Sequence, residues 1–363
     1  MTTTTPVEPI DQSPRGTDTA DEVAGRLLDV LNDGSIAVLA SLGHRLGLFD
    51  TLLALPPATS QQVSDAAGLD ERYVREWLGG VATAGFVDYD PVARTYALRP
   101  DHAPFLTGAS PDNLARTLQY VTLMGEVVPK VAEAFRSGGG LTYADYPGFH
   151  EIQAADTGAV LDLALVDLIL PWTGATDRLR AGIDVADVGC GSGHAVNLLA
   201  RAFPASRFTG IDFEPDAIGA ARAEAAAWGL TNATYLVADA AAEASPAAYD
   251  LITAFDTIHD QAHPAKVLAN IYAALRPAGT FLMGDIDAAT RLEDNLDLPW
   301  ASFLYAVSTT HCMSVSLAQG GDGLGTVWGV ERAERMLREA GFATVETHRL
   351  EENPFNVYFV ARA

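Results

Sequence analysis

The sequence predicts an α/β fold in which a mainly helical N-terminal domain precedes a domain built on a mostly parallel sheet. From residue 181 onward, strand-like segments alternate with alanine-rich helical segments, which is the pattern of βαβ units. Two strand-like segments, 342–350 and 353–363, close the chain with almost nothing between them. The sheet is therefore expected to end in an antiparallel hairpin.

Length and charge limit the class of protein and its partners. The chain has 363 residues, enough for two domains, and 47 acidic against 23 basic residues give it a formal charge of −24. Such a charge repels nucleic acid and anionic membranes, so we expect neither as a partner. No apolar run approaches the roughly 20 residues of a membrane span. The partner we expect is a small molecule.

The N-terminal residues 1–20 lack the basic and apolar regions of a signal peptide, and their Thr, Pro and acidic content predicts a disordered tail. Cys190 and Cys312 are too few for a disulfide framework. A reducing, cytoplasmic location is the natural interpretation.

The next segment, residues 21–109, has the outline of a winged helix. Residues 58–86 predict helix, turn and helix, and two short alternating strands follow. The second helix carries Arg72 and Arg75, which Asp70, Glu71 and Glu76 balance. A DNA-recognition helix normally has a basic excess, so dimerisation is the expected role. Residues 110–175 predict a helical connector that overhangs the active site.

A glycine-rich loop follows the first strand of the C-terminal domain. The motif DVGCGSGH, residues 187–194, places Gly189, Gly191 and Gly193 between a strand and a helix. Glycines let the backbone approach a ligand, and the amides at the helix N-terminus face it. The spacing is neither the dinucleotide form G-x-G-x-x-G nor a phosphate-binding P-loop.

Carboxylates at later strand ends strengthen the prediction of a cofactor cleft. Asp212 ends the second strand and can accept both ribose hydroxyls, Asp239 ends the third, and Phe213 can lie against a base. Each aspartate alone could simply cap the next helix. Together with the glycine loop they lie at the carboxyl ends of strands, where open α/β sheets bind ligands.

These motifs resemble those of class I S-adenosylmethionine-dependent methyltransferases, from Asp187 to the C-terminal hairpin. The resemblance implies a Rossmann-like seven-stranded domain, residues 176–363, with an antiparallel last strand. It also implies that Asp187 and the glycines hold the methionine part of the cofactor, Asp212 the ribose and Asp239 the adenine side. Ala240 and Phe255 are further expected cofactor contacts.

A winged helix before this domain resembles the small-molecule methyltransferases of bacterial secondary metabolism and the plant O-methyltransferases. The resemblance implies a homodimer formed by the N-terminal domains. O-methyltransferases of this architecture carry a His-Asp pair after the fourth strand, which His259 and Asp260 match. A histidine there can take the proton of a phenol or alcohol as the methyl group transfers. A packing or capping role is the alternative.

The connection of residues 286–330 is long enough to be functional. Its aromatic and sulfur side chains predict a substrate pocket, although core or dimer contacts are an alternative. The expected pocket residues are Trp300, Tyr305, Met313 and Trp328.

His311 lies on the same connection and can meet His259 above the transferring methyl group. Two imidazoles with open positions suit Fe or Zn, and Asp260, Asp285 or water could complete the site. The pairing resembles bacterial 2-oxo acid C-methyltransferases, which use a two-His metal site. Such a metal would stabilise the enolate of a 2-oxo acid, so that its C3 carbon attacks the methyl group.

Three functions thus follow from the sequence. The first is C3 methylation of a 2-oxo acid, with His259, His311 and Asp260 as catalytic residues. The second is metal-free O-methylation of a phenol or hydroxyl, with His259 as the base. The third is a cofactor-sensing regulator that binds DNA through the winged helix. The second helix of that motif has no excess of basic residues, which argues against this function.

Overall fold

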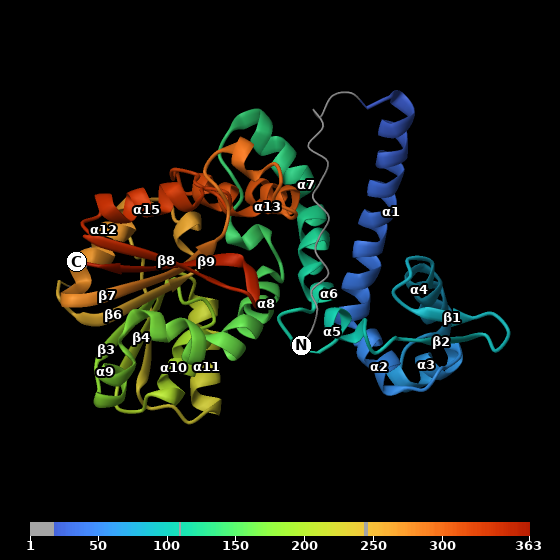
Figure 1. Cartoon of the computed structure of the whole chain (residues 1–363), viewed down its shortest axis with the longest axis horizontal. Coiled ribbons are helices and arrows are strands. Elements are labelled where there is room, and N and C mark those ends of the chain that lie inside the picture. The colour runs from blue at the N-terminus through green and yellow to red at the C-terminus, as the bar shows by residue number, and fades with distance from the viewer. Residues whose placement is uncertain (1–17, 109, 243–245) are drawn as a thin grey trace.

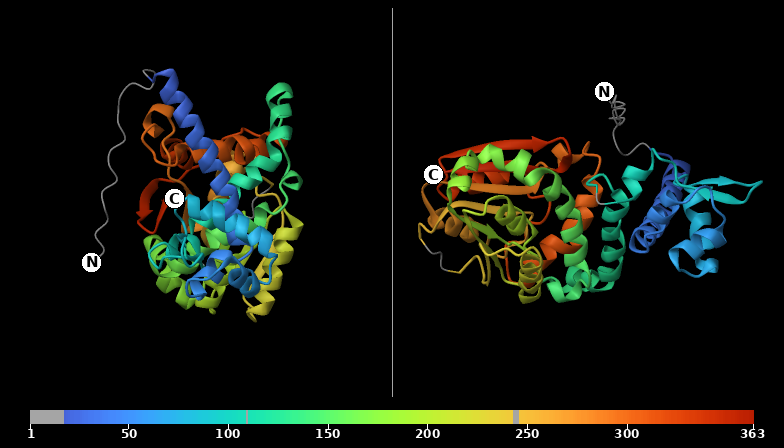
Figure 2. Two further views of the ribbon diagram at one scale, coloured as in Figure 1. Left: turned by 90° about the vertical axis from the view of Figure 1, so that its right-hand side faces the viewer. Right: turned by 90° about the horizontal axis from the view of Figure 1, so that it is seen from below.

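The computed structural model describes residues 18–108, 110–242 and 246–363, which form two lobes (Figure 1). The fold class predicted from the sequence is confirmed: a helical winged-helix domain precedes an α/β domain. The predicted disordered tail lies outside the described residues, apart from positions 18–20. Two views at right angles show the N-terminal lobe standing beside the sheet domain, joined by long helices (Figure 2).

The N-terminal lobe has four helices and a small wing. Its elements are α1 (Ala20–Arg45), α2 (Leu48–Ala54), α3 (Ser60–Ala67), α4 (Glu71–Thr83), β1 (Asp88–Asp90) and β2 (Thr95–Ala97). The side chain of Thr59 caps α3 and Asp70 caps α4, because each accepts a backbone N–H that the first turn leaves free. Phe49 and Trp77 pack edge to face in the core, with ring centroids 5.1 Å apart.

The connector consists of helices that join the two lobes. These are α5 (Ala103–Leu106), α6 (Leu114–Thr117), α7 (Gln119–Ser137), η1 (Tyr143–Asp145), α8 (Phe149–Ala164), η2 (Leu165–Ile169), η3 (Leu170–Thr173) and α9 (Thr176–Ala181). Helix α1 runs alongside α7 (Figure 1), and Ser41 Oγ lies 3.4 Å from Thr122 Oγ1 at their contact. Among the described residues, no single helix is long and apolar enough to cross a membrane, whereas α1 and α2, bent by 68°, meet that requirement together.

The C-terminal lobe is a seven-stranded sheet in the order β5-β4-β3-β6-β7-β9-β8. Its strands are β3 (Asp184–Val188), β4 (Arg207–Asp212), β5 (Ala233–Val237), β6 (Tyr249–Phe255), β7 (Leu275–Ile286), β8 (Thr344–Leu350) and β9 (Asn353–Arg362). The first five are parallel, and β9 is antiparallel to both β7 and β8, as the predicted hairpin requires. The chain adds β4 and then β5 on one side of β3, and it then returns to add β6 on the other side of β3. The switch point lies between β3 and β6. A crevice for ligands is expected at this switch point.

Helices cover the sheet and extend over its carboxyl edge. The covering helices are α10 (His194–Ala202), α11 (Pro215–Ala227), α12 (Pro264–Ala274) and α15 (Val330–Glu339). The segment after β7 contains η5 (Leu292–Asn295), α13 (Ala301–Val307), the π-helical turn η6 (Ser308–Cys312) and α14 (Met313–Ala318). Turn η6 packs against α7, and α14 packs against η4 (Ile258–Asp260). The long connection therefore reaches the strand end that carries His259.

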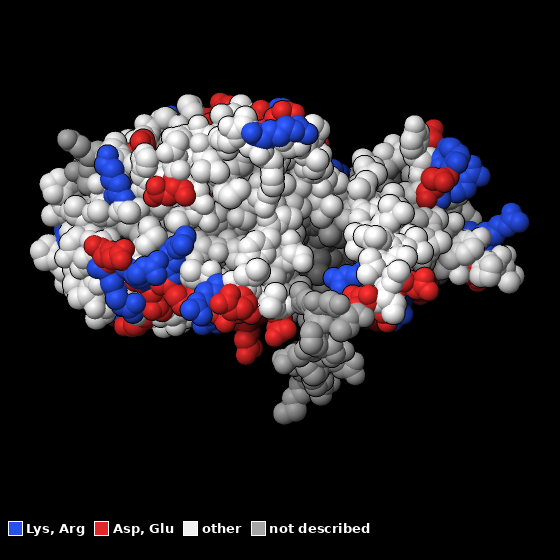
Figure 3. Space-filling view, turned by 90° about the horizontal axis from the view of Figure 1, so that it is seen from above, with Lys and Arg blue, Asp and Glu red and all other residues white. Residues whose placement is uncertain are grey.

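A hollow separates the two lobes on the face shown in Figure 3. A cavity of about 710 Å³ has walls from both lobes, which include Phe86 and Phe105 on one side and Trp300 and Phe303 on the other. The part of the C-terminal lobe that contains Trp300 and Phe303 thus faces an apolar space at the junction of the lobes.

Candidate active site

The glycine loop after β3 lies on a cavity at the predicted switch point. The residues that line this cavity include most of those expected to bind the cofactor: Asp187, Gly189, Gly191, Asp212, Phe213, Ala240 and Phe255. The structure brings these side chains together, although they come from four strand ends. Gly193 and Asp239 are not part of the lining.

Two of the glycines allow close packing. A Cβ on Gly189 would lie 2.0 Å from Thr257 Oγ1, and one on Gly193 would lie 2.5 Å from Ala221 Cβ. Both residues also have positive φ, of 68° and 73°. Gly193 therefore serves the contact between α10 and α11, and of the three glycines of the loop Gly189 and Gly191 border the cavity.

Backbone groups fix the position of the carboxylate of Asp212. Its Oδ2 accepts the N–H of Gly191 at 2.9 Å, and its Oδ1 accepts the N–H of Glu214 at 2.9 Å. The side chain borders the cavity from the end of β4. A carboxylate held in this way retains free lone pairs for the hydroxyl groups of a ligand.

Asp187 is buried at the end of β3 and accepts a hydrogen bond from Thr253 Oγ1 at 2.6 Å. Burial raises the pKa of Asp187 to about 7, and the charge of Asp212 adds to this while the Thr253 bond opposes it. Burial penalises the charged form, so a nearby cation would stabilise this carboxylate.

Asp239, which we expected on the adenine side of the cofactor, does not line the cavity. It is exposed, and its Oδ1 accepts the backbone N–H of Ala241 at 2.7 Å, which makes it a local cap. Its neighbours Ala238 and Ala240 line the cavity in its place. The sequence located the correct strand end there, but the side chain of the aspartate turns to the backbone.

A second cavity, of about 400 Å³, adjoins the first. It lies between the ends of β6 and β7, the connector helices and α13. The two cavities share the lining residues Gln153, Thr157, Leu161, Phe255, Asp256 and Asp260. A molecule in the second cavity is thus adjacent to a molecule in the first, and we call the second the acceptor cavity.

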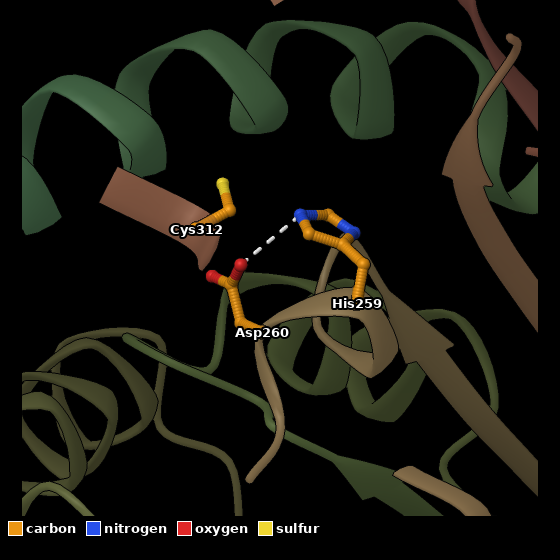
Figure 4. Close-up of side chains that lie close together, drawn as sticks. All are labelled: His259, Asp260 and Cys312. Atoms are coloured by element: carbon orange, nitrogen blue, oxygen red, sulfur yellow. Dashed lines mark ion pairs between the residues drawn. The ribbon is translucent and has the colours of Figure 1, made fainter. Parts of the chain in front are cut away.

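His259 borders the acceptor cavity and is held by a buried carboxylate. Its Nδ1 lies 2.8 Å from Asp285 Oδ1, which also accepts Trp328 Nε1–H at 3.0 Å. His259 Nε2 lies 3.2 Å from Asp260 Oδ1 (Figure 4), yet without the alignment of a hydrogen bond. The imidazole is therefore fixed through Nδ1, and Nε2 is the nitrogen left for chemistry.

The two carboxylates determine the protonation of His259. Burial lowers the pKa of His259, but the charges of Asp285 and Asp260 raise it more, so that it lies well above its ordinary value. The two carboxylates beside the ring therefore favour its protonated form. For Asp260 the two effects have the opposite signs: burial raises its pKa, and the charge of His259 lowers it.

Cys312, on the π-helical turn, lies beside the same pair (Figure 4). One ligand atom from each of His259, Asp260 and Cys312 lies within 4.8 Å of the others. Burial, with the charge of Asp260, raises the pKa of the thiol to about 11, so it is neutral at physiological pH. A nitrogen, an oxygen and a sulfur donor suit a transition metal such as zinc, provided the thiol loses its proton.

His311 is not part of this group, although the sequence predicted it as the partner of His259 on a metal. Its ring stacks on Phe149 with centroids 3.6 Å apart and contacts Tyr146 at 4.6 Å. Both ring nitrogens are buried without a hydrogen-bond partner among the described residues. Burial lowers the pKa of His311 to about 3, and the charges of His259 and His150 act in the same direction. His311 is therefore a neutral, packed side chain in this structure.

The expected pocket residues divide into two groups. Trp300 lines the acceptor cavity, whereas Tyr305, Met313 and Trp328 do not. Trp328 is 2% exposed, and its indole holds Asp285 instead of facing a ligand. Phe303, from the same connection, also lines the cavity. Sequence reasoning missed several lining residues, which come from other segments: Tyr120, Phe149, Asp256 and Phe355.

Apart from His259, the charged residues that line the acceptor cavity are all acidic. They are Asp112, Asp156, Asp256, Asp260 and Glu352, and the lining that the structure describes includes no Lys or Arg. Arg116 is buried and donates to Asp156 at 3.1 Å. Arg291 lies 3.5 Å from Glu293, and its side chain is 73% exposed. An anionic acceptor would therefore find His259 but no Lys or Arg in the described lining.

Comparison with protein families supports the two-domain description. Residues 34–108 match the model of an Rv2258c-like winged HTH domain, and residues 179–341 match the model of a methyltransferase domain. These matches confirm the predicted winged helix and the predicted methyltransferase domain. They define the class of protein as one that carries a methyltransferase enzyme domain.

Curated relatives resemble part of the chain. Trans-aconitate 2-methyltransferase of Rhodopseudomonas palustris is 31% identical over 115 residues, which make up 32% of this chain and 40% of that protein. Ubiquinone biosynthesis O-methyltransferase of Methylococcus capsulatus is 30% identical over 112 residues, or 31% of this chain and 46% of that protein. The chain thus spans less than half the length of these relatives.

Solved structures share the fold over nearly the whole chain. The human N-acetylserotonin methyltransferase in complex with SAM has a TM-score of 0.67 at 17% identity, covering 96% of this chain and 99% of that chain. A protein of Nostoc punctiforme has a TM-score of 0.70 at 19% identity, covering 93% and 98%. The mitomycin 7-O-methyltransferase has a TM-score of 0.66 at 20% identity, covering 95% and 100%. At these identities the likeness concerns the fold alone.

Proposed function

We propose that the protein is an S-adenosylmethionine-dependent methyltransferase that acts on a hydroxyl group of a small molecule. The cofactor would occupy the cavity at the glycine loop. Asp187 would face the ammonium group of its methionine part, because a cation relieves a buried carboxylate whose pKa is raised to about 7. Asp212 would accept the ribose hydroxyls, and Phe213 would lie against the adenine from the same strand end.

One observation carries the proposal of O-methylation: His259 is fixed through Nδ1 by Asp285 at the border between the two cavities. A histidine oriented by a carboxylate in this way is the usual form of a general base. When bound, the cofactor supplies an electrophilic sulfonium methyl group. His259 Nε2 would take the proton of the acceptor hydroxyl and so make its oxygen the nucleophile toward that methyl group. Asp285 and Asp260 stabilise the imidazolium that results.

The raised pKa of His259 gives this mechanism a distinct pH dependence. A protonated imidazole cannot accept a proton, so the base is present only above the folded-state pKa, which lies well above the ordinary value because of Asp285 and Asp260. The positive charge of a bound sulfonium would lower that pKa and favour the neutral form. Activity is therefore expected to rise with pH.

The alternative, C3 methylation of a 2-oxo acid on a metal, has weaker support. A 2-oxo acid carries a carboxylate, and the described lining of the acceptor cavity offers no Lys or Arg to bind it. His259, Asp260 and Cys312 are the residues that would hold a metal, which would act there as a Lewis acid. In that case Asp285 would hold Nδ1 of His259, the ring nitrogen that does not bind the metal. His311, with its ring between aromatic side chains, is left out of this set.

We further propose a homodimer formed by the N-terminal lobe. The first half of α1 presents apolar side chains to solvent, such as Leu27 at 63% and Leu31 at 64% exposure. Contiguous exposed apolar surface of this kind marks a site of protein contact. Binding of DNA by the winged helix has less support, because Arg72 pairs with Glu76, and Arg75 lies 3.5 Å from Glu71. Basic and acidic side chains also intermingle on the face shown in Figure 3.

The replacement His259→Gln tests the proposed function. Glutamine retains a polar side chain of similar reach but cannot act as a base near neutral pH. We expect the release of S-adenosylhomocysteine to fall by about 10²-fold or more, while calorimetry shows unchanged affinity for the cofactor. A variant that turns over phenols and alcohols at the wild-type rate would refute the role of His259.

A further inference from the structure

Asp256 is a carboxylate that the proposed mechanism does not use, at the point where the two cavities meet. It directly follows β6 and lines both cavities. Its N–H donates to Gly284 O at 2.9 Å, and the side-chain amide of Asn356 on β9 donates to its Oδ1. Among the described residues, Oδ2 has no hydrogen-bond partner. This oxygen is thus free for a bound molecule.

The backbone of Asp256 supports a functional role. Its φ is +49°, in the left-handed region that residues with a Cβ seldom adopt. Residues held in such conformations cluster at binding and catalytic sites, because the surrounding structure must fix them against the cost. Here the bonds to Gly284 and Asn356 fix the residue from two neighbouring strands.

Asp256 forms no ion pair with a cation among the described residues. Asp156 pairs with Arg116 and Asp260 with His259, whereas Asp256 accepts its side-chain hydrogen bond from the neutral amide of Asn356. Burial raises the pKa of Asp256 to about 7 and the charge of Asp285 adds to this, while the charge of His259 and the Asn356 bond oppose it. A cation in the acceptor cavity would stabilise the carboxylate, whereas an anion would be repelled by it.

We propose that Asp256 selects acceptors that carry a protonated amine as well as the hydroxyl that is methylated. This inference rests on the proposed function and specifies its substrate class. The ammonium group donates a charge-assisted hydrogen bond to Oδ2, while Asn356 keeps Oδ1. Asp256 and His259 line the same cavity, so one acceptor can contact both. Asp256 is thus a specificity-determining residue of the acceptor cavity.

The replacement Asp256→Asn tests this inference with little change in shape. Asparagine tolerates positive φ, and its side-chain oxygen can still accept from Asn356. The amide NH₂ then takes the place of Oδ2 and offers a donor where the ammonium requires an acceptor. Asp256→Gly is a second variant, since glycine adopts positive φ without cost and removes the carboxylate. Thermal unfolding confirms that each variant is folded.

Binding is measured by calorimetry on the whole chain saturated with S-adenosylhomocysteine, so no turnover is required. The probes are two matched pairs that differ by the amine: tyramine with 4-ethylphenol, and dopamine with 4-ethylcatechol. We expect the wild-type protein to bind the amine of each pair about tenfold or more tightly than the matched compound without the amine. Both Asp256 variants should lose that preference. The control Asp112→Asn, which alters another carboxylate of the same cavity, retains it.

The outcomes separate this inference from the proposed function. A wild-type protein that binds S-adenosylhomocysteine but shows no preference for either amine overturns the role of Asp256 alone. The same holds if Asp256→Asn keeps the preference, or if Asp112→Asn removes it equally. A protein that does not bind S-adenosylhomocysteine overturns the proposed function together with the inference.

Discussion

The replacement Asp285→Asn probes the link between the buried carboxylate and the proposed base. Asp285 Oδ1 lies 2.8 Å from His259 Nδ1 and accepts Trp328 Nε1–H at 3.0 Å, so an asparagine oxygen in this position can keep the contacts while losing the charge. A charge pair about 4 Å apart at an effective dielectric constant of about 20 interacts with about 4 kcal/mol, or roughly three pKa units. We take this as the upper limit for the fall in the pKa of His259.

The pH profile of the variant follows from the sign of this change. The charge of Asp285 raises the pKa of His259 in the folded protein, so its removal lowers the pH above which the neutral base is present. The rising limb of kcat/KM should therefore move toward acid by one to three units, roughly. At its plateau the rate should be about 10²-fold lower, because the imidazole is oriented less well and its imidazolium is less stabilised.

The assay combines S-adenosylhomocysteine release over a pH series with an NMR titration of the His259 side chain. The matched control is Asp287→Asn, two residues along the chain, whose carboxylate pairs with the exposed Arg349. That variant should keep both the profile and the rate, and lose less than about 1 kcal/mol of stability. An unchanged pKa of His259 in Asp285→Asn would refute the claim that Asp285 sets its protonation.

Three further predictions follow from the geometry. Asp212→Ala removes the carboxylate at the end of β4, so calorimetry should show about tenfold or weaker cofactor binding, and unchanged affinity would contradict the placement of the ribose. Gly193→Ala places a methyl group against Ala221 at positive φ, and should lower the free energy of unfolding by more than about 1 kcal/mol in denaturant titration; a variant as stable as the wild type would disprove the steric argument. Leu27→Glu with Leu31→Glu puts charge on the exposed face of α1, and light scattering should then report a monomer where the wild type is a dimer.

Much of the fold was predictable because its signals are local. The alternation of strands and helices, the hairpin at the end and the glycine loop each depend on short segments of sequence. The same holds for the positions of Asp187 and Asp212, since the carboxyl ends of parallel strands meet at one edge of the sheet. Asp239 shows the limit of this reasoning, because a strand end fixes a position but not the direction of a side chain.

The rest of the site depends on contacts between distant segments. The surroundings of His311 come from Phe149 and Tyr146, more than 150 positions earlier in the chain. Trp328 was expected in the pocket because it is aromatic, but its indole N–H reaches Asp285 across the lobe. Asp256 carried no signal of its own, since its positive φ and its bond from Asn356 exist only in the folded sheet.

The central claim is methyl transfer to a hydroxyl group without a metal. The most direct measurement is S-adenosylhomocysteine release by the exhaustively chelated protein, with phenols, alcohols and 2-oxo acids offered in parallel. The account predicts that hydroxyl acceptors, above all those with an amine, are methylated at the same rate before and after chelation. Turnover of 2-oxo acids alone, lost on chelation and restored by added iron or zinc, would contradict it.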